Sequence, residues 1–163
     1  MENYNKNYAK PLKRLISICK RGYNIYLNAA RYTQNTSCSS VFKHYAKQRQ
    51  NFIEELNQRL YAMGVSPTDI EKGDENLNSK FQQFWMKFKQ SIIGTGNNDK
   101  DILLTIRNSE RKALDSYDDV LQGDILETDL KPILVKQRTE ISMAFQQINK
   151  LYLELFPPAH NEL

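Results

Sequence analysis

Acidic residues are missing from the first part of this sequence, because no Asp or Glu lies between Asn3 and Phe52. The chain as a whole has a net charge of +4. Because this stretch contains Lys and Arg but no acidic residue, it carries a local excess of positive charge. Such an asymmetry is typical of a basic surface that binds nucleic acid or anionic lipid. A basic helical face that packs near an acidic one, in the same fold or in an oligomer, gives the same asymmetry. The sequence leaves both explanations open.

Cysteines and long apolar runs are also scarce. Cys19 and Cys38 are too few for a disulfide framework, and their spacing matches no metal-binding motif. No run approaches the roughly 18 consecutive apolar residues that a membrane-spanning helix needs. The first residues contain no apolar segment of the kind found in signal peptides. These absences predict a cytoplasmic protein without a membrane span.

Glycine and proline number only 6 and 5, and most of them separate stretches in which apolar residues recur every three or four positions. This spacing favours a few long helices. The first stretch predicts a helix from about 11 to 34, with Pro11 in its first turn. Gly22 lies inside it at a cost of about 1 kcal/mol relative to Ala, which a close approach of another helix would offset. The second helix starts near the cap candidates Asn35–Ser39 and ends at Gly64.

The second half of the chain predicts two further long helices. One begins with Asn98 or Asp99 as its cap and ends at Gly123. The other begins after the cap candidate Thr128 and stops before Pro157-Pro158. The second and third long helices are separated by roughly 34 residues, too many for a simple turn.

The long connection decides the predicted topology. It contains its own amphipathic segment, from about Asn78 to Ile93, with Trp85 on its apolar face. Short loops make the first two helices antiparallel neighbours, and likewise the last two. The sequence therefore predicts an all-α, ferritin-like four-helix bundle: two antiparallel hairpins joined by a long crossover that carries an extra short helix. One domain covers residues 1–163, with its core at about 11–155.

Four sequence segments carry a family resemblance. They are LISICKRGYNIYLNAA, FKHYAKQRQNFIEELNQRL, FQQFWMKFKQSIIG and ILLTIRNSERKALDSYDDVL. They hold a Cys and a Gly near each other in the first helix, a QR-x-x-F segment, a Trp helix in the crossover and an E-x-x-A-x-x-x-Y segment. The chain resembles, over about residues 11 to 155, a family of small, largely uncharacterised bacterial ferritin-like four-helix proteins. The resemblance implies the fold and supplies no activity.

The wider ferritin-like superfamily suggests a carboxylate-bridged di-iron site. Such a site takes a Glu from each of two helices and a Glu-x-x-His from each of the other two. Here the first predicted helix has no acidic residue and no Glu-x-x-His occurs anywhere. His44 lies off the apolar stripe of its helix and His160 lies in the tail. Glu110 and Glu140 are the remaining metal-ligand candidates, so we expect no metal and no other cofactor.

Polar residues interrupt the apolar stripes at one height in the middle of the bundle. The first helix offers Tyr23 or Tyr26, and the others offer Arg49, Glu110 and Gln137. An isolated buried charge is very costly. We therefore expect Arg49 to pair with Glu110, with Gln137 and a Tyr hydroxyl completing the hydrogen bonds. The alternative is that Arg49 reaches solvent along its aliphatic stem.

Three functions remain open at this point. The leading prediction is a non-enzymatic bundle that acts through protein interaction or as a homo-oligomer such as a dimer, since neither His has a plausible Ser or Cys partner for catalysis. The second is an iron- or manganese-binding protein that uses Glu110 and Glu140. The third is a nucleic-acid or anionic-lipid binder that uses a basic surface near the start of the chain. That surface comprises Lys10, Lys13, Arg14, Lys20 and Arg21.

Overall fold

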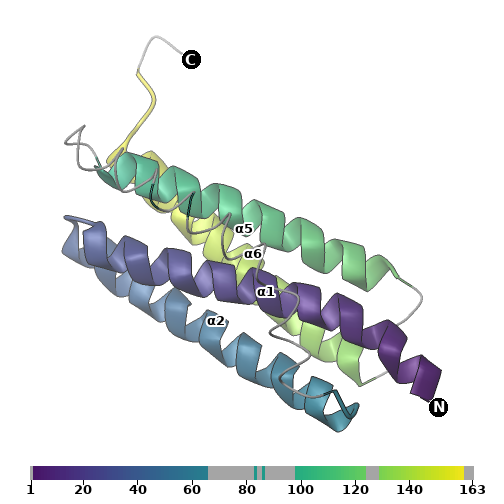
Figure 1. The fold of residues 1–163 in the computed structure, drawn as a ribbon. Coiled ribbons are helices and arrows are strands. Elements are labelled where there is room, and N and C mark those ends of the chain that lie inside the picture. Colours follow the sequence, from purple (N-terminus) through teal and green to yellow (C-terminus); the bar gives the residue numbers. More distant parts are fainter. Residues whose placement is uncertain (1, 66–82, 84–85, 87–97, 124–128, 160–163) are drawn as a thin grey trace.

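Four long helices form the described part of this protein. The computed structural model describes residues 2–65, 83, 86, 98–123 and 129–159, and within these ranges it contains no strand. The helices are α1 (Glu2–Tyr32), α2 (Thr36–Ala62), α5 (Asn98–Gln122) and α6 (Leu130–Leu155). They lie side by side as an elongated bundle (Figure 1). The prediction of an all-helical four-helix bundle is therefore confirmed.

The helices form two hairpins that pack against each other. α1 packs on α2 and α5 packs on α6, while α1 also contacts α5 and α2 contacts α6. Arg14 contacts Asp119, and Thr33 contacts Asp99. These contacts show that α1 is antiparallel to α5. α2 and α5 therefore run in the same direction on diagonal corners, and the end of α2 and the start of α5 lie at opposite ends of the bundle (Figure 1).

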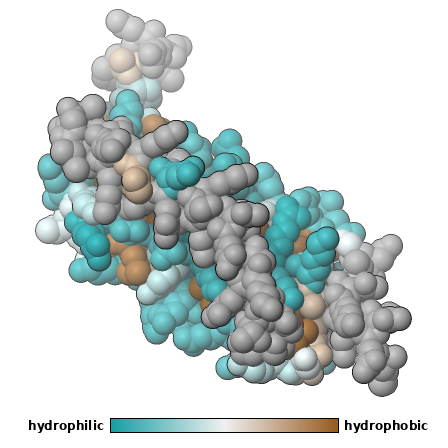
Figure 2. All heavy atoms as spheres, viewed as in Figure 1, coloured by the Kyte–Doolittle hydropathy of each residue, from teal (hydrophilic) through white to brown (hydrophobic). Residues whose placement is uncertain are grey.

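The predicted crossover helix, about 78 to 93, lies almost wholly outside the described residues. Of its positions the structure describes Gln83 and Met86, which are both helical and exposed. No helix in the described part of the chain has the length and apolarity needed to cross a bilayer. In the view of Figure 2, hydrophilic side chains dominate the described surface and the hydrophobic patches are small and separate.

α1 begins nine residues before the predicted start, so the placement of Pro11 in the first turn is wrong. Pro11 lies inside the helix, where it cannot donate a hydrogen bond to the carbonyl four residues earlier. The side chains of Tyr8 and Ala9 are buried, and Ala9 belongs to the core. We attribute the longer helix to this burial, which offsets the missing hydrogen bond.

Both ends of α2 follow from local side-chain chemistry, as predicted. The Asn35 side chain caps the first turn by accepting a hydrogen bond from the Cys38 amide at 3.0 Å. Gly64 ends the helix with φ +79°, a conformation that costs little only for Gly. Its amide donates to the Tyr61 carbonyl, and the Val65 amide donates to the Leu60 carbonyl. This pair of bonds is a Schellman motif.

The starts of α5 and α6 differ from the prediction. Asn98 is already the first helical residue of α5. The Asp99 carboxylate binds the α1–α2 turn, where it accepts hydrogen bonds from the Thr33 hydroxyl at 2.6 Å and the Gln34 amide at 3.3 Å. Asp129 occupies the cap position of α6 without a side-chain hydrogen bond, and Thr128 lies outside the described residues. Asp99, which local capping rules assign to the start of α5, thus bonds to the α1–α2 turn instead.

The core divides into two clusters of different composition. The aliphatic half lies toward the C-terminal end of α2, and the aromatic half lies toward the α1–α2 turn. The aliphatic half includes Leu12, Leu15, Ile16, Cys19, Phe52, Leu56, Leu60, Tyr117, Leu134 and Ile141. The aromatic half includes Ile25, Tyr26, Phe42, Tyr45, Ile102, Leu103, Ile106 and Ile148.

Candidate functional site

A layer of polar side chains lies where the two halves of the core meet. Four polar or charged residues are buried in the described structure: Arg49, Glu110, Ser116 and Gln137. Three of them are residues that the sequence places in the predicted layer. The Ser116 hydroxyl has its hydrogen-bond partner within its own helix, because it donates to the Lys112 carbonyl one turn earlier at 3.0 Å. The unusual chemistry of the core therefore resides in the other three and their neighbours.

Arg49 and Glu110 form an ion pair across the diagonal of the bundle. Arg49 Nη2, on α2, donates directly to Glu110 Oε2, on α5. Each residue is only 1% exposed. Arg49 Nη1 also donates to Gln48 Oε1 at 3.1 Å. The Arg49 side chain thus points into the core in the structure and does not extend to solvent.

Aromatic rings and a glycine surround the guanidinium of Arg49. Its central carbon lies 5.8 Å from the centroid of the Tyr26 ring and 5.5 Å from that of Phe52. Both are within the range of a cation–π interaction. A Cβ atom built on Gly22 would lie 3.4 Å from Arg49 Nε. The small residue that the sequence places inside α1 therefore lies against the buried arginine.

The tyrosine of the layer is Tyr26, and Tyr23 is only half-buried at the edge of the aromatic half. The Tyr26 hydroxyl is buried but makes no hydrogen bond of acceptable geometry with any described residue. Burial, and next the neighbouring Glu110 carboxylate, raise the pKa of Tyr26 well above its ordinary value. Burial likewise raises the pKa of Glu110, while Arg49 opposes that rise. Tyr26 stays protonated at neutral pH.

A second hydrogen-bonded chain takes one residue from each helix. Gln137 Nε2, on α6, donates to Glu55 Oε2, on α2, at 2.9 Å. Gln137 Oε1 accepts from the Tyr117 hydroxyl of α5 at 2.7 Å. The prediction that Gln137 completes the bonds of the Arg49–Glu110 pair is therefore wrong. The amide of Gln137 bridges two other partners because it can donate and accept at once.

Cys19, on α1, ends this chain, with its Sγ 3.3 Å from the Tyr117 hydroxyl oxygen. Because the Tyr117 proton is given to Gln137, the thiol must be the donor to Tyr117. Burial raises the pKa of Cys19 to about 11, which keeps the thiol protonated. The sequence interpretation places Cys19 and Tyr117 on apolar stripes and assigns no role to Glu55. Periodicity shows which residues face the core, and it does not show which of them meet across helices.

The polar layer does not fit a di-iron centre. In the part of the chain that the structure describes, no three His, Cys, Asp or Glu side chains come close enough to share a metal ion. The Glu110 carboxylate faces a guanidinium, which is a cation in the region where two metal cations would need anionic ligands. Glu140 is half-buried on α6 and His44 is exposed on α2. These residues lack the clustered carboxylates and imidazoles that such a centre requires.

The basic residues near the start of α1 divide between solvent and a partner on α5. Lys10, Arg14 and Arg21 are exposed, and Lys13 and Lys20 are half-buried. Arg14 Nη2 lies 3.4 Å from Asp119 Oδ2. At this point the basic helix meets an acidic residue of the second half of the chain, which is one of the two explanations left open by the charge asymmetry.

Comparisons with known proteins identify a family. No curated protein matches the chain. A family model with the description "Domain of unknown function (DUF2383)" matches residues 7–123, well over half of the 163 residues. The match covers most of α1 and all of α2 and α5, and therefore includes Arg49, Glu110 and Tyr117. The chain belongs to this family of domains of unknown function.

Proposed function

We propose that this protein is a non-catalytic, ferritin-like bundle that acts through its surface, by binding protein partners or a second copy of itself. Support for the ferritin-like connectivity comes from the parallel, diagonal placement of α2 and α5, with the end of α2 and the start of α5 at opposite ends of the bundle. Two hairpins joined by one long connection have this geometry. The two cysteines are free and buried, which agrees with a cytoplasmic location.

The observation that carries the proposal is the Arg49–Glu110 pair. In a metal-binding bundle, carboxylates from facing helices point inward and neutralise cations that enter from solution. Here a permanent cation of the protein itself neutralises the Glu110 carboxylate. The centre of the bundle therefore needs no ion, and the chemistry available for function lies on the outside.

The outer face of α6 is the best candidate for an interaction surface. Seven large hydrophobic side chains are exposed in the described part of the chain, and four of them lie on this helix. The four are Val135, Met143, Leu153 and Leu155. Val135 and Leu153 lie on one side of the helix, because 18 residues correspond to five full turns. Leu155 follows Leu153 by two residues and lies on nearly the opposite side of the helix, so the candidate surface consists of Val135, Met143 and Leu153.

Metal analysis tests the first part of the proposal. The protein is expressed with added iron and manganese, purified, and measured by mass spectrometry beside Glu110→Gln and the matched control Glu54→Gln, which changes an exposed carboxylate of α2. We expect metal far below one ion per chain in all three. Stoichiometric metal that is lost only in Glu110→Gln would overturn the proposal and establish a metal site at Glu110.

Light scattering during size exclusion tests the second part. We expect the wild type to have twice the 19.1 kDa mass of one chain. The double variant Val135→Asp/Met143→Asp should have the mass of one chain, because charges on both sides of a symmetric contact repel. Tyr61→Asp, which changes an exposed side chain of α2, serves as the control and should stay dimeric. A wild-type mass of one chain contradicts self-association.

A further inference from the structure

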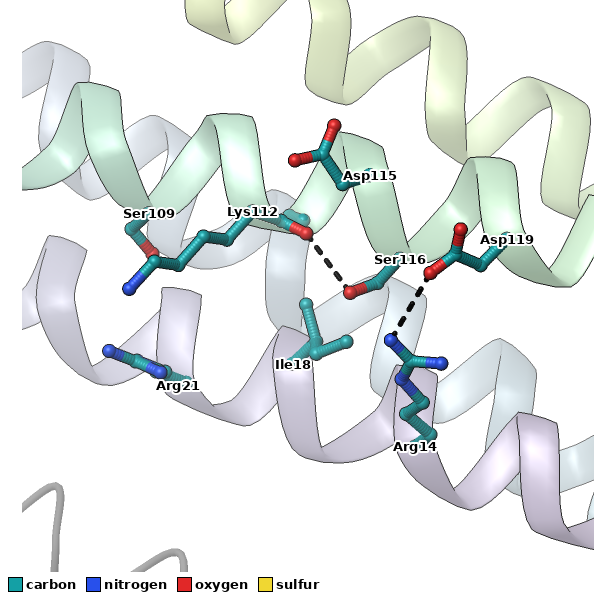
Figure 3. Close-up of a pocket in the computed structure, with 9 residues that line it drawn as sticks. Arg14, Ile18, Arg21, Ser109, Lys112, Asp115, Ser116 and Asp119 are labelled. Atoms are coloured by element: carbon teal, nitrogen blue, oxygen red, sulfur yellow. Dashed lines mark hydrogen bonds and ion pairs between the residues drawn. The ribbon is translucent and has the colours of Figure 1, made fainter.

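A groove between α1 and α5 contains two positive charges, those of Arg21 and Lys112, that pair with no described residue. Its volume is about 320 Å³, near the lower end of the range for small-molecule sites. Ile18 and Ala113 contribute apolar side chains to its lining. Figure 3 shows Arg21, Lys112 and Ser109 gathered at one end of this groove, with the Lys112 ammonium held above the Arg21 guanidinium.

The charges at the two ends of the groove are balanced differently. At one end, Arg14 is neutralised by Asp119 at 3.4 Å. At the other end, the side chains of Arg21 and Lys112 form no ion pair or hydrogen bond with any described residue. Asp115 also lines the groove, but Figure 3 shows its carboxylate directed away from α1. The net charge at the Arg21 end is therefore positive.

We propose that the Arg21 end of this groove binds a phosphate group. Two cations that approach each other without a counter-ion repel, and a dianion placed between them removes that repulsion. The guanidinium of Arg21 offers a planar pair of donors that matches two phosphate oxygens. The Lys112 ammonium and the Ser109 hydroxyl supply donors from the opposite helix. The site goes beyond the proposed role of the α6 face, which it does not require.

An NMR titration with inorganic phosphate at constant ionic strength tests the site. We expect saturable shifts of the amides around Arg21 and from Ser109 to Lys112. The double variant Arg21→Gln/Lys112→Gln should weaken binding by about tenfold or more, because it removes both charge-assisted contacts. The matched control Arg31→Gln/Lys100→Gln removes two exposed cations from the same helices outside the groove. It lowers the net charge equally and should change the affinity by less than about twofold.

Two results would overturn the proposal. One is equal weakening in both double variants, which would mean attraction to overall charge. The other is the absence of saturable shifts in the groove. A second titration with vesicles of phosphatidylcholine, with and without phosphatidic acid, identifies the source of the phosphate. Groove-dependent binding to the phosphatidic acid vesicles assigns the site to lipid headgroups, and binding of inorganic phosphate alone assigns it to soluble phosphates.

Discussion

The two halves of the core use the same residue type in opposite ways. In the aliphatic half, the buried hydroxyl of Tyr117 donates to Gln137 and accepts from Cys19. In the aromatic half, the buried hydroxyl of Tyr26 makes no hydrogen bond of acceptable geometry with a described residue. An unsatisfied buried polar group costs free energy, while a satisfied one is close to neutral or favourable. The difference indicates that the hydroxyl of Tyr117 stabilises the fold through its hydrogen bonds, whereas Tyr26 stabilises the fold mainly through its ring.

The ring of Tyr26 has its own contacts, which explain why a tyrosine can occupy this position. Its centroid lies 6.3 Å from that of Phe42 and 5.4 Å from that of Tyr45. Arg49 covers the same ring. Aromatic pairs and cation–π contacts of this geometry stabilise beyond the apolar area that they bury. The aromatic half thus supports the charged layer from one side, and the hydrogen-bonded chain supports it from the other.

The largest expected effect comes from breaking the layer between the halves. Glu110→Ala leaves the Arg49 charge buried and unpaired, so we expect a loss of about 3–5 kcal/mol in the free energy of unfolding. The double variant Arg49→Met/Glu110→Leu should recover most of this loss, because apolar residues of similar volume replace both charges. Urea denaturation measures both. A Glu110→Ala protein within about 0.5 kcal/mol of wild type would refute the buried pair.

The direct test of the comparison replaces each tyrosine by phenylalanine. Tyr117→Phe leaves the Gln137 Oε1 atom and the Cys19 thiol without their partner, and it should cost about 1–3 kcal/mol. Tyr26→Phe removes a hydroxyl that lies near the Glu110 carboxylate without a hydrogen bond of acceptable geometry, so it should cost less than Tyr117→Phe. Thermal and urea unfolding of the two variants give the ranking. Equal losses in both would show that the Tyr26 hydroxyl is also bonded in solution, and would abolish the contrast.

Gly22 offers a finer test, because it lies against Arg49 at the boundary of the halves. A Cβ atom at this position would meet Arg49 Nε at 3.4 Å, an ordinary contact distance. Gly22→Ala should therefore keep the pair and gain up to about 1 kcal/mol from helix propensity. Gly22→Leu should instead displace Arg49 and destabilise by about 1–3 kcal/mol. If Gly22→Ala is as harmful as Gly22→Leu, the arginine tolerates no added atom.

The smallest expected effect on stability concerns two contacts between α5 and α6, one beside each half of the core. Beside the aliphatic half, Arg138 Nε donates to Asp118 Oδ1 at 2.5 Å. Beside the aromatic half, Arg107 lies 5.1 Å from the centroid of the Tyr152 ring, a contact without a carboxylate. The hydrogen bond from Arg138 lowers the pKa of Asp118 below its ordinary value of 3.8. A lowered folded-state pKa gives stability that is present above pH 3.8 and is lost as the pH falls through the folded value.

Asp118→Asn should therefore lower the free energy of unfolding at pH 7. At a lower pH, where the wild-type carboxylate is protonated, the substitution should have no effect on stability. Both side chains of the pair are more than one third exposed, so the effect is small. Tyr152→Phe keeps the ring under Arg107 and should show no change with pH in this range. Unfolding curves at pH 7 and in acid distinguish the two. A pH-independent cost of Asp118→Asn would mean that its charge is not what matters.

Helix number, most helix ends and three buried residues of the polar layer, Arg49, Glu110 and Gln137, were predictable from local signals. Apolar periodicity requires no knowledge of partners, and Gly64 and Asn35 act within their own turns. The partners of Gln137 were not predictable, because they depend on the relative height and rotation of three helices. Pro11 misled for a related reason, since burial of residues before it decides where α1 begins. The groove between α1 and α5 likewise exists only after the hairpins dock.

The Arg49–Glu110 bond also has a consequence for the order of folding. Its partners are 61 positions apart and belong to different hairpins, so they meet only when the hairpins dock. Hairpins with short loops close quickly, and contacts between distant segments form later. A slip of one helical turn, about 5.4 Å, would separate the two charges and leave both buried without a partner. The pair therefore selects the correct docking register, and its loss should accelerate unfolding more than it slows folding.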